Sequence, residues 1–372
     1  MEGKSRSSST GKSGILITAA SAFIAALSCS CSPEIPFRGI IGVDVTPPGF
    51  QGIRAVAGDR VELRFSESVS VVSLRFDPPA EPVSIAAHPF AEGSAVVSVG
   101  LDRAIGAGAR CVADAVVEDA EGNSLTVLAP FLGRNDRIPA LLINEARTEY
   151  SKPKVEFVEL LVVGAGNLGA VGLYSASAGF SSPLYVFPPV EVSRGDYLLV
   201  HLRTLEAPEV DETGLLDESD GYESCPTARD FWVAGSEKRL RKTDALMLAD
   251  QDGAILDALI LSESAAGNWQ GEALAEAVRV LAEKGAWEAG GADGTGGTDG
   301  TDGTDGTDGI EPRHAVPSAG CTPTRSVCRE EGRLDGDTAT DWFLCATGCA
   351  TPGKPNRSER YDAASARKSK KN

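Results

Sequence analysis

Short stretches between residues 41 and 132 alternate apolar and polar positions, which predicts β-strands with one buried face. The clearest stretch is 61–65, where Val, Leu and Phe alternate with Glu and Arg. Similar stretches lie at 69–76, 83–87, 95–99, 111–117 and 125–128. Asp, Gly and Asn residues at 119–123 supply a turn between the last two stretches. This spacing predicts a small β-sandwich over residues 41–132.

A second β-rich region is predicted over residues 140–356. We expect strands at 141–145, 155–160 and 195–200, and an Asp-Gly turn at 252–253 predicts a hairpin. An insertion at 264–320 interrupts this region. The predicted fold class is therefore mainly β, with two sandwiches in tandem and a helical, low-complexity insertion in the second.

The insertion combines a predicted helix with a repeat. Apolar residues recur at helical spacing within 272–288, which predicts one amphipathic helix. Residues 290–309 are dominated by a Thr-Asp-Gly repeat, and a segment so rich in Gly and Asp cannot form a core, so we expect a disordered loop. Calcium binding is the alternative, although the spacing matches neither the EF-hand loop nor the nonapeptide repeat.

Residues 1–28 have the pattern of an export signal. Lys4, Arg6 and Lys12 precede an uncharged, mostly apolar run at 14–27, which is too short to span a bilayer as a helix. The run ends in Ala-Leu-Ser-Cys at 26–29, which resembles a bacterial lipobox of the looser spirochaete type. The resemblance implies cleavage before Cys29 and a lipid such as palmitate on that cysteine, with Cys31 as the alternative site. An ordinary secretory signal and an uncleaved anchor remain open. Residues 29–40 would form a tether.

The first β region resembles bacterial Ig-like domains of the surface-layer type. The resemblance rests on Thr-Pro-Pro at 46–48, Leu-Arg-Phe-Ser-Glu at 63–67, and Asp119 with Asn-Ser-Leu at 123–125. An unrelated β-sandwich is the alternative. The resemblance implies a spacer or an adhesion module.

The second β region resembles lamin-tail domains, which are also Ig-like β-sandwiches. An Ile-Asn-Glu strand at 143–145, a Val-Glu-Leu strand at 158–160 and a closing Thr-Pro-Gly-x-x-Asn motif at 351–356 occur in the family's order. The large insertion departs from the family pattern. The resemblance implies a structural signature made of Asn144, Glu145, Glu159, Thr351, Pro352, Gly353 and Asn356.

The charge and the residue types exclude several classes of function. The 372 residues carry a formal charge of −18, which disfavours nucleic acid as a partner. The chain has only three His residues, and it contains no Gly-x-Ser-x-Gly motif. The Gly-rich segment 164–169 matches a dinucleotide-binding pattern, but the residues after it are typical of a strand instead of a helix. We therefore expect a turn there, and no cofactor.

Six cysteines beyond the lipobox are candidates for disulfides, because an exported chain folds where disulfides persist. They are Cys111, Cys225, Cys321, Cys328, Cys345 and Cys349. The last four lie within 29 residues and allow three connectivities. A zinc site and free thiols are the alternatives, although the spacing departs from short zinc knuckles. We expect no metal.

Two charged segments complete the sequence. The acids Asp211, Glu212, Asp217, Glu218 and Asp220 form a dense loop, which is either solvated or part of a catalytic site. Residues 357–372 form a basic tail, which we expect to be disordered or to contact anionic lipid or an acidic partner.

These features together predict a lipid-anchored envelope protein, exported to the bacterial cell membrane or outer membrane. We expect it to act without catalysis, as a scaffold or adhesion module that binds an envelope or extracellular protein or glycan. The alternative is an accessory subunit of an exported hydrolase, or a cryptic hydrolase itself. The sequence does not identify which strand edge would meet a partner.

Overall fold

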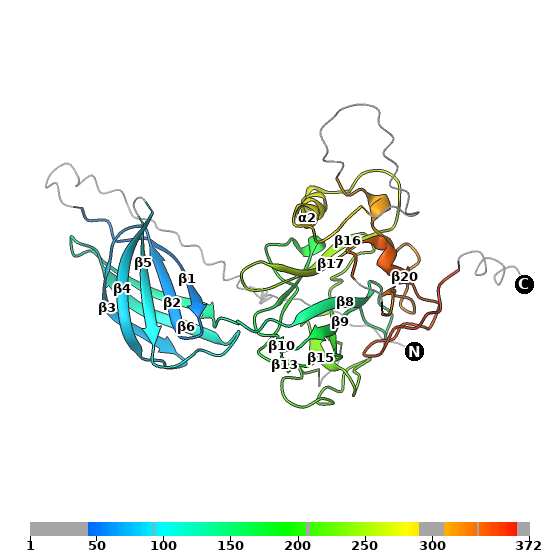
Figure 1. Cartoon of the computed structure of the whole chain (residues 1–372), viewed down its shortest axis with the longest axis horizontal. Coiled ribbons are helices and arrows are strands. Elements are labelled where there is room, and N and C mark those ends of the chain that lie inside the picture. Colours follow the sequence, from blue (N-terminus) through cyan, green and yellow to red (C-terminus); the bar gives the residue numbers. More distant parts are fainter. Residues whose placement is uncertain (1–43, 92–93, 206–208, 290–308, 333–334, 363–372) are drawn as a thin grey trace, which may run out of the picture. The chain divides into compact units, whose positions relative to one another are not determined.

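The structure is a computed structural model that describes residues 44–91, 94–205, 209–289, 309–332 and 335–362. The predicted signal peptide, lipidated cysteine and tether lie outside these residues, as do nearly all of the Thr-Asp-Gly repeat and the end of the basic tail. The described chain is mainly β, as the sequence predicts. Each of its two β regions is described by itself below (Figure 1).

The first region forms two antiparallel sheets with the strand orders β1-β2-β5-β4 and β3-β6-β7. Its strands are β1 (Phe50–Ala57), β2 (Arg60–Phe65), β3 (Ser70–Asp77), β4 (Pro82–Ala91), β5 (Ser94–Leu101), β6 (Arg110–Glu118) and β7 (Ser124–Leu132). In β2, the apolar residues Val61, Leu63 and Phe65 are buried and the charged residues between them are not. Residues of both sheets share one apolar core, so the alternation seen in the sequence has produced a sandwich.

The second region contains a six-stranded sheet, a five-stranded sheet and a short two-stranded ladder. Their strand orders are β15-β14-β9-β8-β19-β20, β12-β11-β16-β17-β18 and β10-β13. The strands are β8 (Ala140–Arg147), β9 (Phe157–Gly164), β10 (Gly166–Asn167), β11 (Gly172–Ser175), β12 (Tyr185–Val186), β13 (Glu191–Val192), β14 (Tyr197–His201), β15 (Arg229–Trp232), β16 (Asp244–Ala249), β17 (Ile255–Ser262), β18 (Val316–Pro317), β19 (Val327–Arg329) and β20 (Trp342–Leu344).

A large apolar core lies between the six-stranded and five-stranded sheets. Leu160 and Val200 come from the first sheet, and Leu246 and Leu259 come from the second. The Asp-Gly hairpin predicted at 252–253 joins β16 to β17, and Gly253 adopts a positive φ of 80° in its turn. Three short 3-10 helices lie in the connections: η1 (Ala176–Ala178), η2 (Pro312–His314) and η3 (Ala339–Asp341).

The predicted helix is present but shorter than expected. Helix α2 (Glu272–Glu283) buries Ala277, Val278 and Leu281 against the large core. It ends at Glu283 and not at 288, because Gly285 adopts a positive φ of 66° that stops the helix. In the part of the chain that the structure describes, none of the helices combines the length and the apolar composition needed to cross a membrane.

The prediction of a disordered tail from residue 357 is wrong at its beginning. The Ala346 amide donates to the Glu359 carbonyl at 2.7 Å, and the Tyr361 amide donates to the Leu344 carbonyl at 2.9 Å. Cys345 and Arg360 form an antiparallel bridge. Residues 359–361 therefore run along the chain that follows β20, because this edge offers unpaired backbone groups.

Candidate functional site: a buried polar layer on the six-stranded sheet

The six-stranded sheet has one apolar face and one polar face. Val158 and Leu160 on β9 belong to the apolar core, and Glu159 lies between them. On β14 and β15 the residues alternate in the same way, with Val200 and Phe231 in the core. Because successive side chains of a strand point to opposite faces, Glu159 lies on the face away from that core. This second face is also covered, since its side chains are buried.

Two carboxyl groups lie next to each other on this polar face. Glu145 on β8 is the cross-strand partner of Glu159 on β9, and both side chains are fully buried. The strand register shifts between Ile143 and Glu145, so β8 is irregular where the acid enters the layer. Two buried carboxylates side by side are unfavourable unless hydrogen bonds or protons compensate for the charge.

The closing segment, residues 351–356, supplies many of these hydrogen bonds. The Thr351 amide donates to Glu145 at 3.2 and 3.1 Å, and its hydroxyl donates to the same group at 3.1 Å. The Gly353 amide donates to Glu159 at 2.5 Å, and the Asn144 amide group donates to Glu159 at 2.6 Å. The two acids are therefore held by donors from a segment about 200 residues further along the chain.

Asn356 fastens the end of the closing segment. Its side-chain amide donates to the Asn144 carbonyl at 3.0 Å, to the Asn144 side-chain oxygen at 3.2 Å and to the Arg329 carbonyl at 2.9 Å. We call this set, made of Asn144, Glu145, Glu159, Thr351, Gly353 and Asn356, the closing cluster. The structure thus brings together six of the seven signature residues named from the sequence; Pro352 lies between Thr351 and Gly353.

Burial changes the acidity of both carboxyl groups. Desolvation raises the pKa of Glu145 to about 7, although hydrogen bonds from Ser326 and Thr351 oppose the shift. Desolvation and the neighbouring charge of Glu145 raise the pKa of Glu159 well above its ordinary value. The pair therefore retains protons at pH values where exposed carboxyl groups are ionised.

Three of the predicted disulfide cysteines lie beside the closing cluster. Cys328 and Cys345 are buried together with Phe343, and Cys349 packs against them. The Ser326 hydroxyl lies 3.7 Å from the Cys328 sulfur and 3.4 Å from the Cys345 sulfur, and it donates to Glu145. The hydrogen bond with Cys328 lowers the pKa of Cys345 to about 6.

The structure does not contain the disulfides expected from the sequence. All six described cysteines carry free thiols. They are also divided among different surroundings: Cys111 is in the core of the first region, Cys321 is in the large core of the second, and Cys225 lies against Gly353. Proximity in the sequence therefore did not place Cys321 in the small cysteine cluster.

A buried ion pair adjoins the closing cluster. Arg329 on β19 donates to Asp257 on β17 at 2.8 Å and to the Ile143 carbonyl at 2.8 Å, and it also contacts Asp335. Desolvation raises the pKa of Asp257 to about 7 despite the charge of Arg329. Carboxylate oxygens of Asp257, Asp335 and Asp337 lie within 4.8 Å of one another. The Arg329 guanidinium already supplies positive charge to this group, so the arrangement is an internal ion pair.

Another buried pair occupies the far side of the polar layer. His201 Nε2 lies 2.7 Å from Asp230, and the His201 ring stacks on Trp232 with centroids 3.9 Å apart. The Cys225 amide donates to the second oxygen of Asp230 at 2.8 Å. The side chains of this group are all buried, namely His201, Asp230, Trp232 and Cys225. The arrangement holds the loop before β15 against the sheet.

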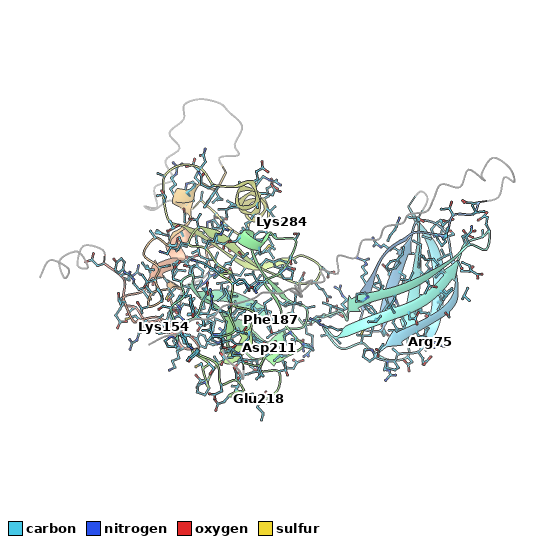
Figure 2. The ribbon with its side chains drawn as sticks, turned by 180° about the vertical axis from the view of Figure 1, so that it is seen from behind. Arg75, Lys154, Phe187, Asp211, Glu218 and Lys284 are labelled. Carbon is cyan, nitrogen blue, oxygen red and sulfur yellow. The ribbon has the colours of Figure 1, made fainter. Side chains whose placement is uncertain are left out.

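The acidic loop divides into structural and solvated residues. Asp211 accepts hydrogen bonds from the Trp232 amide and the Tyr185 hydroxyl, both at 2.7 Å. Glu212 is buried and accepts from the Asp230 amide at 2.9 Å. Glu218 lies at the rim of the second region in the view of Figure 2, and its side chain is exposed, as are those of Asp217 and Asp220. The loop is therefore not a single convergent acidic site.

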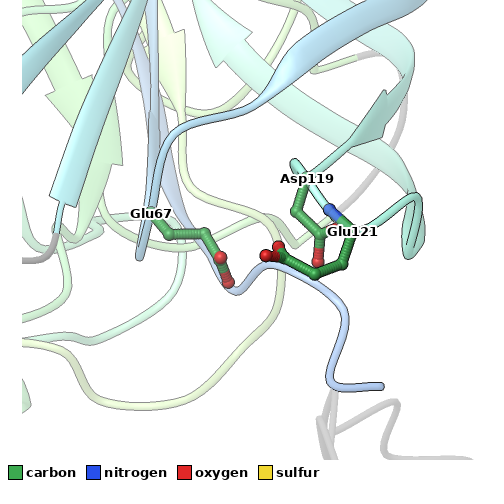
Figure 3. A group of neighbouring side chains, drawn as sticks. All are labelled: Glu67, Asp119 and Glu121. Atoms are coloured by element: carbon green, nitrogen blue, oxygen red, sulfur yellow. The ribbon is translucent and has the colours of Figure 1, made fainter. Parts of the chain in front are cut away.

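Two further sequence features have structural roles. Gly166 and Asn167 form β10, and the chain continues into strand β11, so the segment 164–169 is not followed by the helix that a dinucleotide site requires. In the first region, Glu67, Asp119 and Glu121 bring carboxylate oxygens within 4.8 Å of one another (Figure 3). Asp119 accepts hydrogen bonds from the Asn123 side chain and from two backbone amides of its own turn.

Sequence reasoning missed Arg329, Asp257 and Ser326 as members of the polar layer. A signal for Asp257 was present, because it is the single charged residue in the otherwise apolar stretch 255–261. A charge in such a strand needs a buried partner. Nothing in the local pattern identified Arg329 as that partner, because it lies 72 positions away.

Comparisons with known proteins find a family and a relative that match the second region. Residues 139–344 match the TP_1001 protein second domain family. An uncharacterized protein of Treponema pallidum (strain Nichols) is 28% identical over 238 residues, which cover 61% of this chain and 56% of that protein. The match therefore spans little more than half the length of this relative.

A likeness to a solved structure is weak. The N-terminal part of the bacterial S-layer protein SbsC shares 11% identity, with a TM-score of 0.22, over 58% of this chain and 44% of that one. The family match is of a different kind, since it covers more than half of the chain and runs from β8 to β20. The chain belongs to the TP_1001 protein second domain family.

Proposed function

We propose that the protein is an exported lipoprotein of the bacterial envelope, anchored through a lipid on Cys29, that acts without catalysis as a scaffold or binding module. The closing cluster is the observation that supports a role without catalysis. Both oxygens of Glu145 and Glu159 accept hydrogen bonds from the chain itself, and both side chains are fully buried. A general acid or base must reach its substrate.

The envelope location is supported by the sequence and by the relative. A basic segment, a short apolar run and a cysteine follow one another within residues 4–29, in the order that lipoprotein export requires. A relative occurs in a spirochaete, the group whose looser lipobox this sequence resembles. A multi-chain lipid anchor would hold the β regions stably at a membrane surface.

The domain resemblances belong to the same proposal. An Ig-like first region and a lamin-tail-like second region would act as rigid modules that present loops and strand edges to a protein or glycan partner. The closing cluster would then maintain the second module, because it ties the end of that module to β8 and β9.

Lipid labelling tests the anchor. The full chain, expressed in a bacterium that processes lipoproteins, is fed a palmitate analogue and recovered from the membrane fraction. We expect Cys29→Ser to abolish labelling and the matched Cys31→Ser to retain it. Loss of label only in the Cys31 variant would overturn the site, and an unlabelled wild-type chain would overturn the anchor.

Hydrolysis assays test the non-catalytic role. The purified chain should leave phosphodiesters and peptides intact. Hydrolysis that disappears with Glu218→Ala would overturn the proposal in favour of a cryptic hydrolase, because that acid is exposed and does not hold the fold. Loss with Glu212→Ala would be less informative, since Glu212 supports β15.

A further inference from the structure

The acidic loop, residues 209–221 before β15, has the reverse of an ordinary loop's side-chain arrangement. Its Glu212 side chain is fully buried, whereas Leu215 is 74% exposed and Leu216 is 43% exposed. A loop usually turns its acids to water and its apolar side chains to the protein, because burial of a leucine is favourable and burial of a carboxylate is not. The loop therefore buries an acid and leaves two leucines in water.

The exposed apolar side chains of the second region are gathered at this place. Among its described residues, the large apolar side chains that are exposed are Tyr150, Val186, Val210, Leu215 and Leu216. Three of them lie on the acidic loop. Val186 belongs to β12, which contacts the loop through the hydrogen bond from the Tyr185 hydroxyl to Asp211. Single exposed apolar residues are ordinary, but a group of them is typical of a binding surface.

Hydrogen bonds inside the loop hold the leucines outward. Glu212 accepts from the Glu218 amide at 2.9 Å and from the Ser219 amide at 3.1 Å. The Arg229 guanidinium donates to the carbonyls of Glu212 and Gly214. Both ends of the turn that carries the leucines are therefore fixed from within. Because this turn is already ordered, little conformational entropy is lost when it binds a partner.

The charge around the leucines is negative. Asp217, Glu218 and Asp220 follow them, and their side chains are exposed; Figure 2 shows Glu218 at the rim of the second region. The sequence has no Lys or Arg at positions 204–228. Like charges repel, so this surface disfavours an anionic membrane and a second copy of a chain whose formal charge is −18. It complements an apolar surface that is bordered by cations.

We propose that the acidic loop is the surface through which the protein binds a partner protein, and that the partner offers an apolar pocket bordered by Lys and Arg side chains. Leu215, the more exposed leucine, would fill the pocket and supply affinity. Asp217 and Glu218 would meet the bordering cations, which speeds association and selects the partner. This inference rests on the proposed function, because it names the surface of the binding module.

Peptide display tests the surface. Random peptides displayed on phage are selected on the immobilised full chain at low salt, and the enriched peptides are titrated by fluorescence anisotropy. We expect them to combine apolar residues with Lys or Arg. Leu215→Ser should weaken their binding about tenfold or more, because the buried leucine is lost. Leu128→Ser is the matched control: Leu128 is also 74% exposed but lies on β7 of the first region, so binding should be unchanged.

The charges are tested separately. Asp217→Asn together with Glu218→Gln should weaken binding about threefold at low salt, and high salt should remove most of this difference because it screens exposed charges. The substituted side chains are exposed, so each variant should keep the wild-type urea midpoint. A lowered midpoint would assign the loss of binding to the fold.

Several results would overturn the proposal. Selection that enriches no peptide, or enriches peptides without Lys or Arg, would do so, and so would an equal loss with Leu128→Ser. Binding that Leu215→Ser leaves unchanged would place the binding surface elsewhere and leave the proposed function intact, whereas hydrolysis in the assays above would overturn that function.

Two further measurements distinguish other occupants. Flotation of the Cys29→Ser chain with phosphatidylglycerol vesicles, lost when Leu215→Ser is added, would assign the leucines to a membrane. A dimer in sedimentation velocity that Leu215→Ser abolishes would assign them to a second copy. We expect neither, because the acids beside the leucines oppose both.

Discussion

The two β regions both bury an apolar core, but they differ in how many charged residues they bury. In the first region, β1–β7, the core is apolar, and Asp119 is its one described charged residue with a buried side chain. In the second region, an apolar core is joined by a layer of buried charges that includes Glu145, Glu159, Arg329 and Asp257. The first region relies on alternation along each strand, and the second also relies on specific pairs of distant residues.

The difference teaches where stability is concentrated. Apolar packing is spread over many contacts, so single polar substitutions at the surface of the first region should matter little. A buried charge costs free energy unless its partner is present, so removal of one partner in the second region should matter greatly. All four tryptophans lie in the second region, at positions 232, 269, 287 and 342. Tryptophan fluorescence therefore follows its unfolding selectively.

The largest effect is expected from Arg329→Ala. This change leaves Asp257 buried with no compensating charge, and the loss of a buried partner costs about 3–5 kcal/mol. The matched change in the first region is Arg54→Ala, which removes the exposed pair of Arg54 with Glu62 at 3.0 Å. Exposed pairs contribute about 0–1 kcal/mol.

Urea unfolding measures both changes. Tryptophan fluorescence should show a much lower midpoint for Arg329→Ala, and far-UV circular dichroism should show Arg54→Ala close to wild type. Arg329→Met with Asp257→Leu is the control, because replacing both charges removes the need for a partner. If Arg329→Ala and Arg54→Ala lost similar stability, the contrast between the two regions would be wrong.

A second effect is expected from pH, because a shift of one pKa unit between the unfolded and folded states corresponds to about 1.4 kcal/mol. Burial raises the pKa of Glu145 from 4.5, and that of Asp257 from 3.8, to about 7. Between these ordinary and raised values the folded state binds more protons than the unfolded chain. The free energy of unfolding of the second region therefore falls as pH rises from about 4 to 7.

The first region should respond in the opposite direction. Desolvation raises the pKa of Asp119, but hydrogen bonds from the Asn123 side chain, and from backbone amides of Asn123 and Glu121, outweigh it and lower the pKa. Ionised Asp119 therefore stabilises the first region at pH values above the ordinary pKa of an aspartate. This stabilisation is lost as pH falls through the lowered pKa. Unfolding at pH 5 and pH 8, followed by tryptophan fluorescence, tests the second region. Glu145→Gln should flatten its profile, and a profile that rises with pH would contradict the expectation.

The fold could be predicted from the sequence where an element depends on residues that are close together in the chain. Alternation in 61–65 and 111–117 gave strands in the first region, and the Asp-Gly turn at 252–253 gave a hairpin in the second. Strand β15 was missed because its four residues, Arg229–Trp232, include two charged ones, and the buried one, Asp230, depends on partners such as Glu212 and His201. Local pattern carries no information on such partners.

The candidate site was predicted in part, through the motif. The resemblance named the signature residues, but it did not indicate that Thr351 and Gly353 donate to Glu145 and Glu159. These contacts join positions about 200 residues apart, and long-range pairing is set by the whole fold. The cysteines show the same limit, because spacing alone grouped Cys321 with thiols that lie in another cluster.

The smallest of these effects, about 2 kcal/mol, is expected from Gly353→Ala, which combines backbone strain with crowding. Gly353 has a positive φ of 75°, and an added Cβ would lie 2.6 Å from the Cβ and Sγ atoms of Cys225. The matched glycine of the first region is Gly122, with a φ of 87° and no atom within 4 Å of an added Cβ. Gly122→Ala introduces the backbone strain without the crowding, and it should lower the free energy of unfolding by about 1 kcal/mol.

Thiol alkylation distinguishes release of the closing segment from a general loss of stability. The Cys225 sulfur is buried and lies 3.7 Å from the Gly353 carbonyl, so displacement of the closing segment exposes it. We expect iodoacetamide to modify Cys225 faster in Gly353→Ala than in wild type, while Cys111 in the first region keeps its rate. Equal rates at Cys225 in the two proteins would show that the closing segment tolerates the methyl group. In that case the second region would be less dependent on specific contacts than its buried charges indicate.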